Sequence, residues 1–215
     1  MNLNDFDTLV MDFNGTILDD RDLCVAILNE MLAMQGHETV TLDRYLHIFT
    51  FPIIEYYKRA GFRLEPEGDE DFDYLAKIFV RKFNERFPNL SIFSDTISFL
   101  EAFKGKKKLI LLSASEQNLL ESELKHFGIL DYFDVVIGIK DIYAASKLKE
   151  AEKYFTENNV DMNKVLFIGD TLHDEEVAKA LGAKSLFVSR GHQHPDILKE
   201  LGESPIMPDL MSIAK

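Results

Sequence analysis

Three apolar runs in this chain, at 8–11, 108–112 and 165–168, are each followed at once by polar side chains. The residues that follow these runs, or that precede the next helix, are Asp12, Asn14, Thr16, Ser113, Ser115, Lys147, Asp170 and Asp174. If the runs are parallel strands, their carboxyl ends share one edge of the sheet, where ligands bind in doubly wound folds. We therefore expect carboxylates, hydroxyls and an ammonium group to meet at one ligand.

Such a set is what the transfer of a phosphoryl group through a carboxylate requires. Asp12 would attack phosphorus and form an aspartyl-phosphate, which divides one hard step into two. Asp170 and Asp174 would hold Mg²⁺, directly or through water, and the ion would neutralise charge between carboxylate and phosphoryl oxygens. Lys147 would add a point positive charge near the nucleophile and the phosphate.

The phosphate itself needs hydrogen-bond donors close to the nucleophile. Ser113 is expected to donate to a phosphoryl oxygen, and Gly15 is expected to let the backbone amides approach the phosphate closely. Ser115 is assigned instead to the N-cap of a helix that begins at about Glu116, since serine is a preferred capping residue.

The elements that would position these residues alternate between strand and helix. After residue 92 the predicted strands are 108–112, 135–137, 165–168 and 185–188, and an amphipathic helix follows each of the first three. Strand–helix–strand units predict a parallel sheet covered on both faces, which is an α/β fold with a doubly wound, Rossmann-like core.

About 75 residues separate the first strand from the second, and they read as helices rather than as one crossover. They include a stretch from about 41 to 62 that is expected to be bent or broken at Pro52. We expect residues 1–17 and 92–215 to form the α/β core, and residues 18–91 to form an inserted helical lobe.

Composition excludes several classes of function. The net charge of −13 argues against nucleic-acid binding and against docking on anionic membranes, since both need clustered Lys and Arg. Cys24 is the sole cysteine, so no internal disulfide forms. With neither a signal peptide nor a membrane span in the sequence, a cytoplasmic protein is expected, as a monomer or homodimer.

The segment Asp12-Phe13-Asn14-Gly15-Thr16, Ser113 after its strand, Lys147, and Gly169-Asp170-x-x-x-Asp174 resemble the four motifs of the haloacid dehalogenase superfamily. Order and spacing agree over nearly the whole chain, and the helical insert resembles the C1 cap of phosphoglycolate phosphatase-like members. The resemblance implies a Mg²⁺-dependent phosphohydrolase. The implied catalytic residues are Asp12, Asn14 and Lys147; the phosphate-binding ones are Gly15, Ser113, Ala114 and Lys147; the metal ligands are Asp12, Asn14, Asp170 and Asp174.

Asn14 departs from the usual phosphatase pattern of the superfamily, which has aspartate there to protonate the leaving oxygen and then activate water. An amide side chain can do neither, although its backbone carbonyl can still ligate Mg²⁺. The departure implies slow turnover, a preference for good leaving groups such as acyl or aryl phosphates, or a substitute acid from the cap or from His173.

Several residues also have structural readings. His173 is expected to be a solvated turn residue, and Asp19 and Asp20 a solvated hinge between core and lobe. The phenylalanine-rich face of the insert is assigned to the core of the lobe rather than to a substrate pocket. The segment 191–194, Gly-His-Gln-His, is read as a polar loop rather than a metal-binding tract.

The leading hypothesis is a phosphohydrolase for a small phosphorylated metabolite. A second is a catalytically weakened phosphate-binding or regulatory protein on the same fold. A third is dehalogenase-type chemistry or phosphonate-cleaving chemistry, and for the latter Lys58 is the lysine to test. Transfer of the phosphoryl group to another acceptor stays open, and the sequence does not give the substrate.

Overall fold

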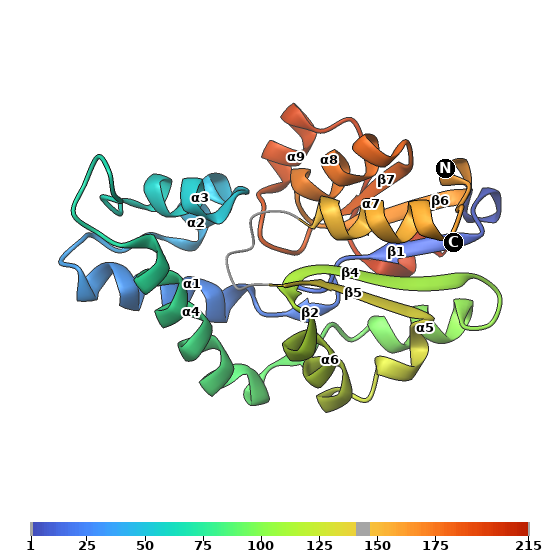
Figure 1. Ribbon diagram of the computed structural model, residues 1–215, viewed down its shortest axis with the longest axis horizontal. Helices are drawn as coiled ribbons and strands as arrows, with labels where there is room; N and C mark the ends of the chain where they lie inside the picture. Colours follow the sequence, from blue (N-terminus) through green and yellow to red (C-terminus); the bar gives the residue numbers. More distant parts are fainter. Residues whose placement is uncertain (1, 141–146, 215) are drawn as a thin grey trace.

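A computed structural model describes residues 2–140 and 147–214 of the chain (Figure 1). The main sheet has the order β5-β4-β1-β6-β7-β8, and every neighbouring pair is parallel. The strands are β1 (Thr8–Met11), β2 (Leu18–Asp19), β3 (Ser91–Ile92), β4 (Lys108–Glu116), β5 (Val135–Ile139), β6 (Val165–Gly169), β7 (Lys184–Val188) and β8 (Ile206–Met207).

The α-helices surround this sheet and build a separate lobe. They are α1 (Arg21–Met34), α2 (Leu42–Ile48), α3 (Ile53–Ala60), α4 (Phe72–Arg86), α5 (Thr96–Phe103), α6 (Gln117–His126), α7 (Leu148–Glu157), α8 (Leu172–Leu181), α9 (Pro195–Leu201) and α10 (Leu210–Ile213). None of the helices in the described part of the chain has the length and apolarity needed to cross a bilayer.

The predicted α/β fold with a parallel sheet is confirmed. Strand β1 lies between β4 and β6, and all four of its side chains are buried because both faces of the sheet are covered. Leu9 and Met11 belong to one apolar cluster, with α5, α6 and α10, whereas Val10 belongs to another, with α7 and α8. Burial on both faces of the sheet therefore explains the uninterrupted apolar run at 8–11, as predicted.

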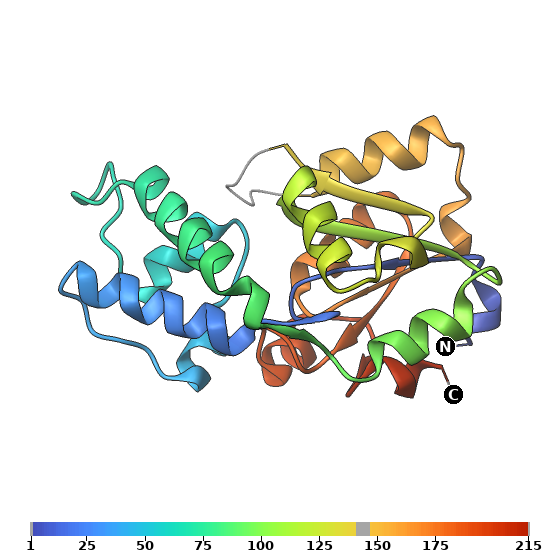
Figure 2. The same ribbon diagram turned by 90° about the horizontal axis from the view of Figure 1, so that it is seen from below.

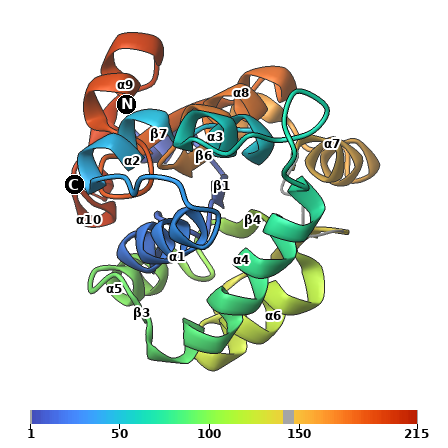
Figure 3. The same ribbon diagram turned by 90° about the vertical axis from the view of Figure 1, so that its left-hand side faces the viewer.

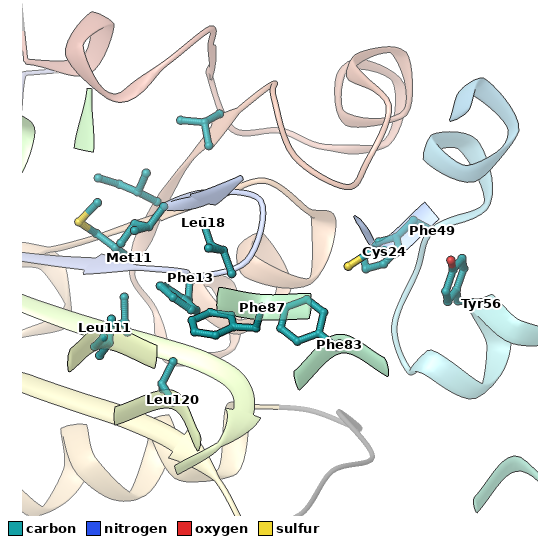
Figure 4. Close-up of a cluster of buried hydrophobic side chains, with 14 of the residues drawn as sticks. Met11, Phe13, Leu18, Cys24, Phe49, Tyr56, Phe83, Phe87, Leu111 and Leu120 are labelled. Atoms are coloured by element: carbon teal, nitrogen blue, oxygen red, sulfur yellow. The ribbon is translucent and has the colours of Figure 1, made fainter. Parts of the chain in front are cut away.

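Helices α1–α4 form a lobe beside the sheet (Figures 1 and 2). The chain enters this lobe through β2 and leaves it through β3, and the two short strands pair antiparallel, with Leu18 opposite Ile92. Seen from the lobe, the four helices lie in front of the sheet (Figure 3). The apolar cluster of the first face extends without a break into the lobe, as the side chains of Figure 4 illustrate.

The predicted break at Pro52 is confirmed, because the stretch from 41 to 62 forms two helices, α2 and α3, and Pro52 is the N-cap of α3. One detail of the predicted elements is wrong. Strand β4 continues through Ser113 and Ser115, and the N-cap of α6 is Glu116, whose side chain accepts a hydrogen bond from the Leu119 amide at 2.9 Å. Ser115 is therefore free for another task.

An ion-pair cluster fastens α1 to α4 inside the lobe. Arg86 donates two hydrogen bonds to the Glu30 carboxylate, at 2.6 and 2.7 Å, and Lys82 donates a third at 2.8 Å. Hydrogen bonds from Arg86 and then Lys82 lower the pKa of Glu30 to about 2. The pair is partly exposed, so its contribution is that of a well-formed surface bridge, about 1 kcal/mol.

We predict that Glu30→Gln lowers the free energy of unfolding by about 1 kcal/mol at pH 7. Because the folded pKa lies below the ordinary value of 4.5, this contribution is complete above pH 4.5 and is lost as the pH falls toward 2. Urea unfolding of both proteins at pH 7 and pH 3 measures it. The control is Glu55→Gln, which removes a single exposed bond to Lys58 at 3.2 Å and should cost less. If both substitutions lowered the free energy of unfolding equally, the paired hydrogen bonds from Arg86 to Glu30 would not be the cause.

Candidate active site

Lys147 connects the carboxylates that follow β1 and β6. Its ammonium pairs with Asp12, donates to Asp174 at 2.6 Å, and donates to the Leu112 carbonyl at 3.2 Å. Burial alone would lower the pKa of Lys147, but the charges of Asp12 and Asp174 outweigh it and raise the pKa. Lys147 is therefore a buried, permanently charged ammonium at the carboxyl edge of the sheet.

Three carboxylates crowd this edge. Oxygens of Asp12, Asp170 and Asp174 lie within 4.8 Å of one another. Burial, with the charges of Asp174 and Asp170, raises the pKa of Asp12 to about 8 although Lys147 opposes the shift. Burial and the charge of Asp174 likewise raise the pKa of Asp170 to about 6, whereas Lys147 holds the pKa of Asp174 below its ordinary value against the effect of burial.

This group of carboxylates suits a hard divalent cation. It offers oxygen donors, as Mg²⁺ prefers, and its mutual repulsion is what a bound cation would relieve. Each carboxylate is also held in place. Asp170 accepts hydrogen bonds from the Thr16 hydroxyl at 3.1 Å and the His192 amide at 2.6 Å, and Asp174 accepts from the Thr171 amide and hydroxyl at 3.0 and 2.9 Å.

Asn14 is fixed at both ends of its amide. Its Nδ2 donates to Asp20 at 2.7 Å, and its Oδ1 accepts from the Ser115 hydroxyl at 3.3 Å. Ser115 in turn accepts a hydrogen bond from the buried Ser113 hydroxyl at 3.1 Å. The two serines and Asn14 therefore form one chain of hydrogen bonds along the strand ends, and the amide contributes no titratable proton to it.

Gly15 has a packing role beside its backbone role. Its φ is +70°, and a Cβ there would lie 2.4 Å from Asp170 Oδ2 and 2.7 Å from the His192 ring. Its amide donates to the Leu18 carbonyl and to Asp20, both at 3.0 Å. The glycine allows the turn after β1 to pass close to Asp170. Its amide already donates hydrogen bonds to Leu18 and Asp20.

A cavity of about 190 Å³ opens at these residues. Its lining includes many of the predicted site residues, namely Asp12, Asn14, Ser113, Ala114, Lys147, Asp170 and Asp174. Neither Gly15 nor His173 lines it. His173 stacks on Phe51 of the lobe, with 4.7 Å between ring centroids, and is partly covered rather than the solvated turn residue that was expected. Lys58 pairs with Glu55 on α3 and likewise stays outside the lining.

Two further residues belong to the site, and both were misread in the sequence. Asp20, expected to be a solvated hinge, is 1% exposed, and His192, expected in a polar loop, is 4% exposed. His192 Nε2 lies 3.0 Å from Asp20, and its Nδ1 lies 2.8 Å from the Tyr45 hydroxyl. Burial opposes protonation of His192, but Asp20 and then Asp170 raise its pKa to about 9. The buried ion pair of His192 and Asp20 therefore fixes the carboxylate that accepts the hydrogen bond from Asn14.

The position of His192 could have been noticed beforehand. It follows the strand at 184–188, and polar residues after a central strand of a doubly wound sheet lie at the ligand-binding edge. Nothing comparable marks Asp20, since its burial depends on His192, which lies 172 residues away in the sequence.

Residues of the lobe also line the cavity. Phe49 and Phe51 come from the segment between α2 and α3, Tyr56 comes from α3, and Phe72 and Phe79 come from α4. The assignment of the phenylalanine-rich face to the lobe's own core is therefore wrong for part of it. Phe83 belongs to the apolar core, but Phe72 and Phe79 are only partly buried and face the cavity as well.

Comparisons with known proteins agree with this architecture. Residues 9–188 match the family described as haloacid dehalogenase-like hydrolase. A phosphoglycolate phosphatase from Synechococcus elongatus is 23% identical over 85% of this chain and 84% of its own length, and a pyrophosphatase from Halalkalibacterium halodurans is 21% identical over 97% of both. A haloacid dehalogenase-like hydrolase structure from Streptococcus pneumoniae superposes with a TM-score of 0.80 at 15% identity, over 98% of both chains.

Proposed function

Because the chain belongs to the haloacid dehalogenase-like hydrolase family, we propose that it is a phosphohydrolase acting on a small phosphorylated metabolite through an aspartyl-phosphate on Asp12. The observation that carries this proposal is the contact of Lys147 with both Asp12 and Asp174, beside Asp170, at one end of an open cavity. Phosphoglycolate phosphatases and a pyrophosphatase among its relatives support the same reaction class.

Each residue then has a separate task. Asp12 supplies the attacking oxygen, and the contact with the Lys147 ammonium favours its ionised form against the effect of burial. The Ser113 hydroxyl and the Ala114 segment would bind phosphoryl oxygens, and both residues line the cavity. Asp12, Asp170 and Asp174 would hold Mg²⁺ together with the Asn14 carbonyl, and the bound ion would neutralise charge on the phosphoryl group. Because position 14 carries no acid, the leaving group departs as an anion, and the rate depends on how stable that anion is.

We propose residues 18–91 as a cap and residues 1–17 and 92–215 as the core. The loop that contains His192 joins the two, since the Gln193 side chain donates to the Phe49 carbonyl at 3.1 Å and the His194 amide donates to the Leu46 carbonyl at 3.0 Å. Closed in this way, α1–α4 exclude water from the nucleophile and add the walls that select the substrate.

Hydrolysis of acetyl phosphate and p-nitrophenyl phosphate, with Mg²⁺ or with EDTA, tests the proposal. We expect turnover that requires the metal, and a loss of at least about 10²-fold in Asp170→Asn, because the variant removes a charge from the metal-binding group. Asp196→Asn, on the exposed first turn of α9, is the matched control and should behave as wild type. Equal rates in Mg²⁺ and EDTA would contradict a metal-assisted phosphohydrolase.

Gly15→Ala should damage both stability and turnover. The variant combines a left-handed backbone, which costs an L-residue about 1–2 kcal/mol, with a collision against Asp170. Gly36→Ala is the matched control, because Gly36 has a φ of +76° with nothing within 4 Å of the added Cβ. Urea unfolding should show the cost of the left-handed backbone in both variants. Activity assays should show a fall in turnover of about tenfold or more in Gly15→Ala alone. Identical behaviour of the two variants would exclude the contact with Asp170 as the cause.

Asn14 supports a second candidate, a phosphate-binding or regulatory protein with weakened turnover. Its amide is held between Ser115 and Asp20 and can neither give nor take a proton. Calorimetry with inorganic phosphate and Mg²⁺ distinguishes the candidates. Tight binding without hydrolysis of any phosphate ester would favour the binding protein, whereas multiple turnovers favour the enzyme.

A further inference from the structure

Aromatic rings of the cap line the same cavity as the carboxylates. Eight of them come from α2, the segment that follows it, α3 and α4, and they are Tyr45, Phe49, Phe51, Tyr56, Tyr57, Phe72, Phe79 and Phe83. Figure 4 shows Phe49, Tyr56 and Phe83 among the buried side chains of this region. The cavity measures about 190 Å³, and an apolar protein cavity of about 150 Å³ holds one benzene molecule. Because this volume includes the end lined by the carboxylates, the cavity has room for no more than a single aromatic ring.

The same lining offers little to a negatively charged leaving group. Among the described lining residues the cationic side chains are Lys147 and His192; the Lys147 ammonium already pairs with Asp12 and Asp174, and His192 already pairs with Asp20. Asp20, Glu116 and Glu123 also line the cavity. A second carboxylate or phosphate on the substrate would enter without a partner cation and would lose its hydration.

Glu123 provides one polar point in this lining. Its side chain comes from α6, is 2% exposed, and has a buried Oε2 without a hydrogen-bond partner. Burial, with the charge of Asp20, raises its pKa to about 8. A buried polar atom that lacks a partner is costly, so a hydroxyl or amide on the ligand would be stabilised there.

Asn14 restricts the leaving group independently of the aromatic lining. Without an acid at that position, the departing oxygen carries its negative charge until water protonates it. A phenolate tolerates that charge far better than an alkoxide, since a phenol has a pKa of about 10. The chemistry at Asn14 and the aromatic lining therefore select the same kind of substrate.

We propose that the substrate is an aryl phosphomonoester whose single, uncharged ring occupies the aromatic part of the cavity and presents a hydrogen-bonding substituent to Glu123. This inference rests on the proposed function for its phosphate end. In the reaction, an Asp12 oxygen bonds to phosphorus as the bond from phosphorus to the aryl oxygen breaks. The phenolate leaves with the electron pair and takes a proton from water, and a second water then releases phosphate and restores Asp12.

Two substrates that differ only in charge test the ring site, namely 4-carbamoylphenyl phosphate and 4-carboxyphenyl phosphate. We expect kcat/KM for the uncharged ester to exceed that for the carboxy ester by about tenfold or more. It should also exceed kcat/KM for 2-phosphoglycolate. Phe79→Ala should lower kcat/KM for the uncharged ester about tenfold, because it removes ring burial, and should lower kcat/KM for acetyl phosphate by a smaller factor. Tyr74→Ala is the matched control on the same helix, since Tyr74 is 54% exposed and lies outside the lining.

Calorimetry with the phenol products separates this inference from the proposed function. The wild-type protein in EDTA should bind 4-hydroxybenzamide in preference to 4-hydroxybenzoate, and Phe79→Ala should weaken that binding. If binding follows this pattern but no ester is hydrolysed, the ring site stands and the phosphohydrolase falls. If 2-phosphoglycolate or the carboxy ester is preferred, or if Phe79→Ala changes neither binding nor turnover, the ring site is overturned while metal-dependent turnover stands.

Discussion

Asp12→Asn should reduce the turnover of acetyl phosphate and p-nitrophenyl phosphate by at least about 10³-fold, because the amide cannot form the aspartyl-phosphate. The substitution keeps the size and position of the side chain. Lys147 retains Asp174 at 2.6 Å and the Leu112 carbonyl at 3.2 Å, so its charge stays partnered. The effect is therefore expected in kcat rather than in KM.

Stability distinguishes this loss from misfolding. Asp12 is one of three crowded carboxylates, and its pKa is raised chiefly by burial, so ionised Asp12 is strained in the metal-free protein. Removing its charge should leave the melting temperature in EDTA unchanged or raise it. Steady-state kinetics and thermal unfolding of the same preparations make the comparison. Retained turnover, or a large fall in melting temperature, would contradict the role of Asp12 as nucleophile.

Asn14→Asp should raise the turnover of esters with poor leaving groups, such as 2-phosphoglycolate, by about 10²-fold, and that of acetyl phosphate less. In the native chain Asn14 Nδ2 lies 2.7 Å from an Asp20 oxygen. A carboxyl placed there must share a proton with Asp20, because two ionised carboxylates at that separation repel. The new side chain would therefore hold the proton that an alkoxide needs as it departs.

Rapid mixing with p-nitrophenyl phosphate shows which half of the reaction the substitution changes. Wild type should release about one nitrophenol per site in a burst, followed by slow steady turnover, because no base activates water against the intermediate. In Asn14→Asp the steady rate should rise toward the burst rate. Asn158→Asp, on the exposed end of α7, serves as the control. Unchanged kinetics in Asn14→Asp would show that position 14 lies outside the proton path.

The pairing of position 14 with Asp20 also gives the substitution a cost. Asn14→Asp should unfold at lower temperature than wild type, since it replaces a hydrogen bond with a contact between two acids. The double variant Asn14→Asp, Asp20→Asn restores one donor and one acceptor to the pair. It should recover part of the lost stability, and failure to do so would place the cost elsewhere, for instance in the contact of Asp20 with His192.

The α/β fold and the meeting of the carboxylates at the strand ends could be predicted from the sequence. Its apolar runs are continuous because strands buried on both faces need no polar alternation, as the burial of every residue in β1 illustrates. In a parallel sheet all carboxyl ends share one edge, so residues directly after β1 and β6, such as Asp12 and Asp170, had to lie near one another. Lys147 could be assigned through the resemblance of four ordered motifs.

The burial of polar groups and the openness of the aromatic faces depend on the three-dimensional fold. Asp20 was predicted to be a solvated residue and His192 to lie in a polar loop, and neither prediction included the contact between them, because the two residues are distant in the chain. Phe79 has the spacing of a core residue, and helical periodicity cannot tell a face packed on another helix from a face that lines a cavity. The burial of these polar groups and the exposure of these rings to the cavity both depend on which distant segments pack together. Local sequence patterns do not specify that packing.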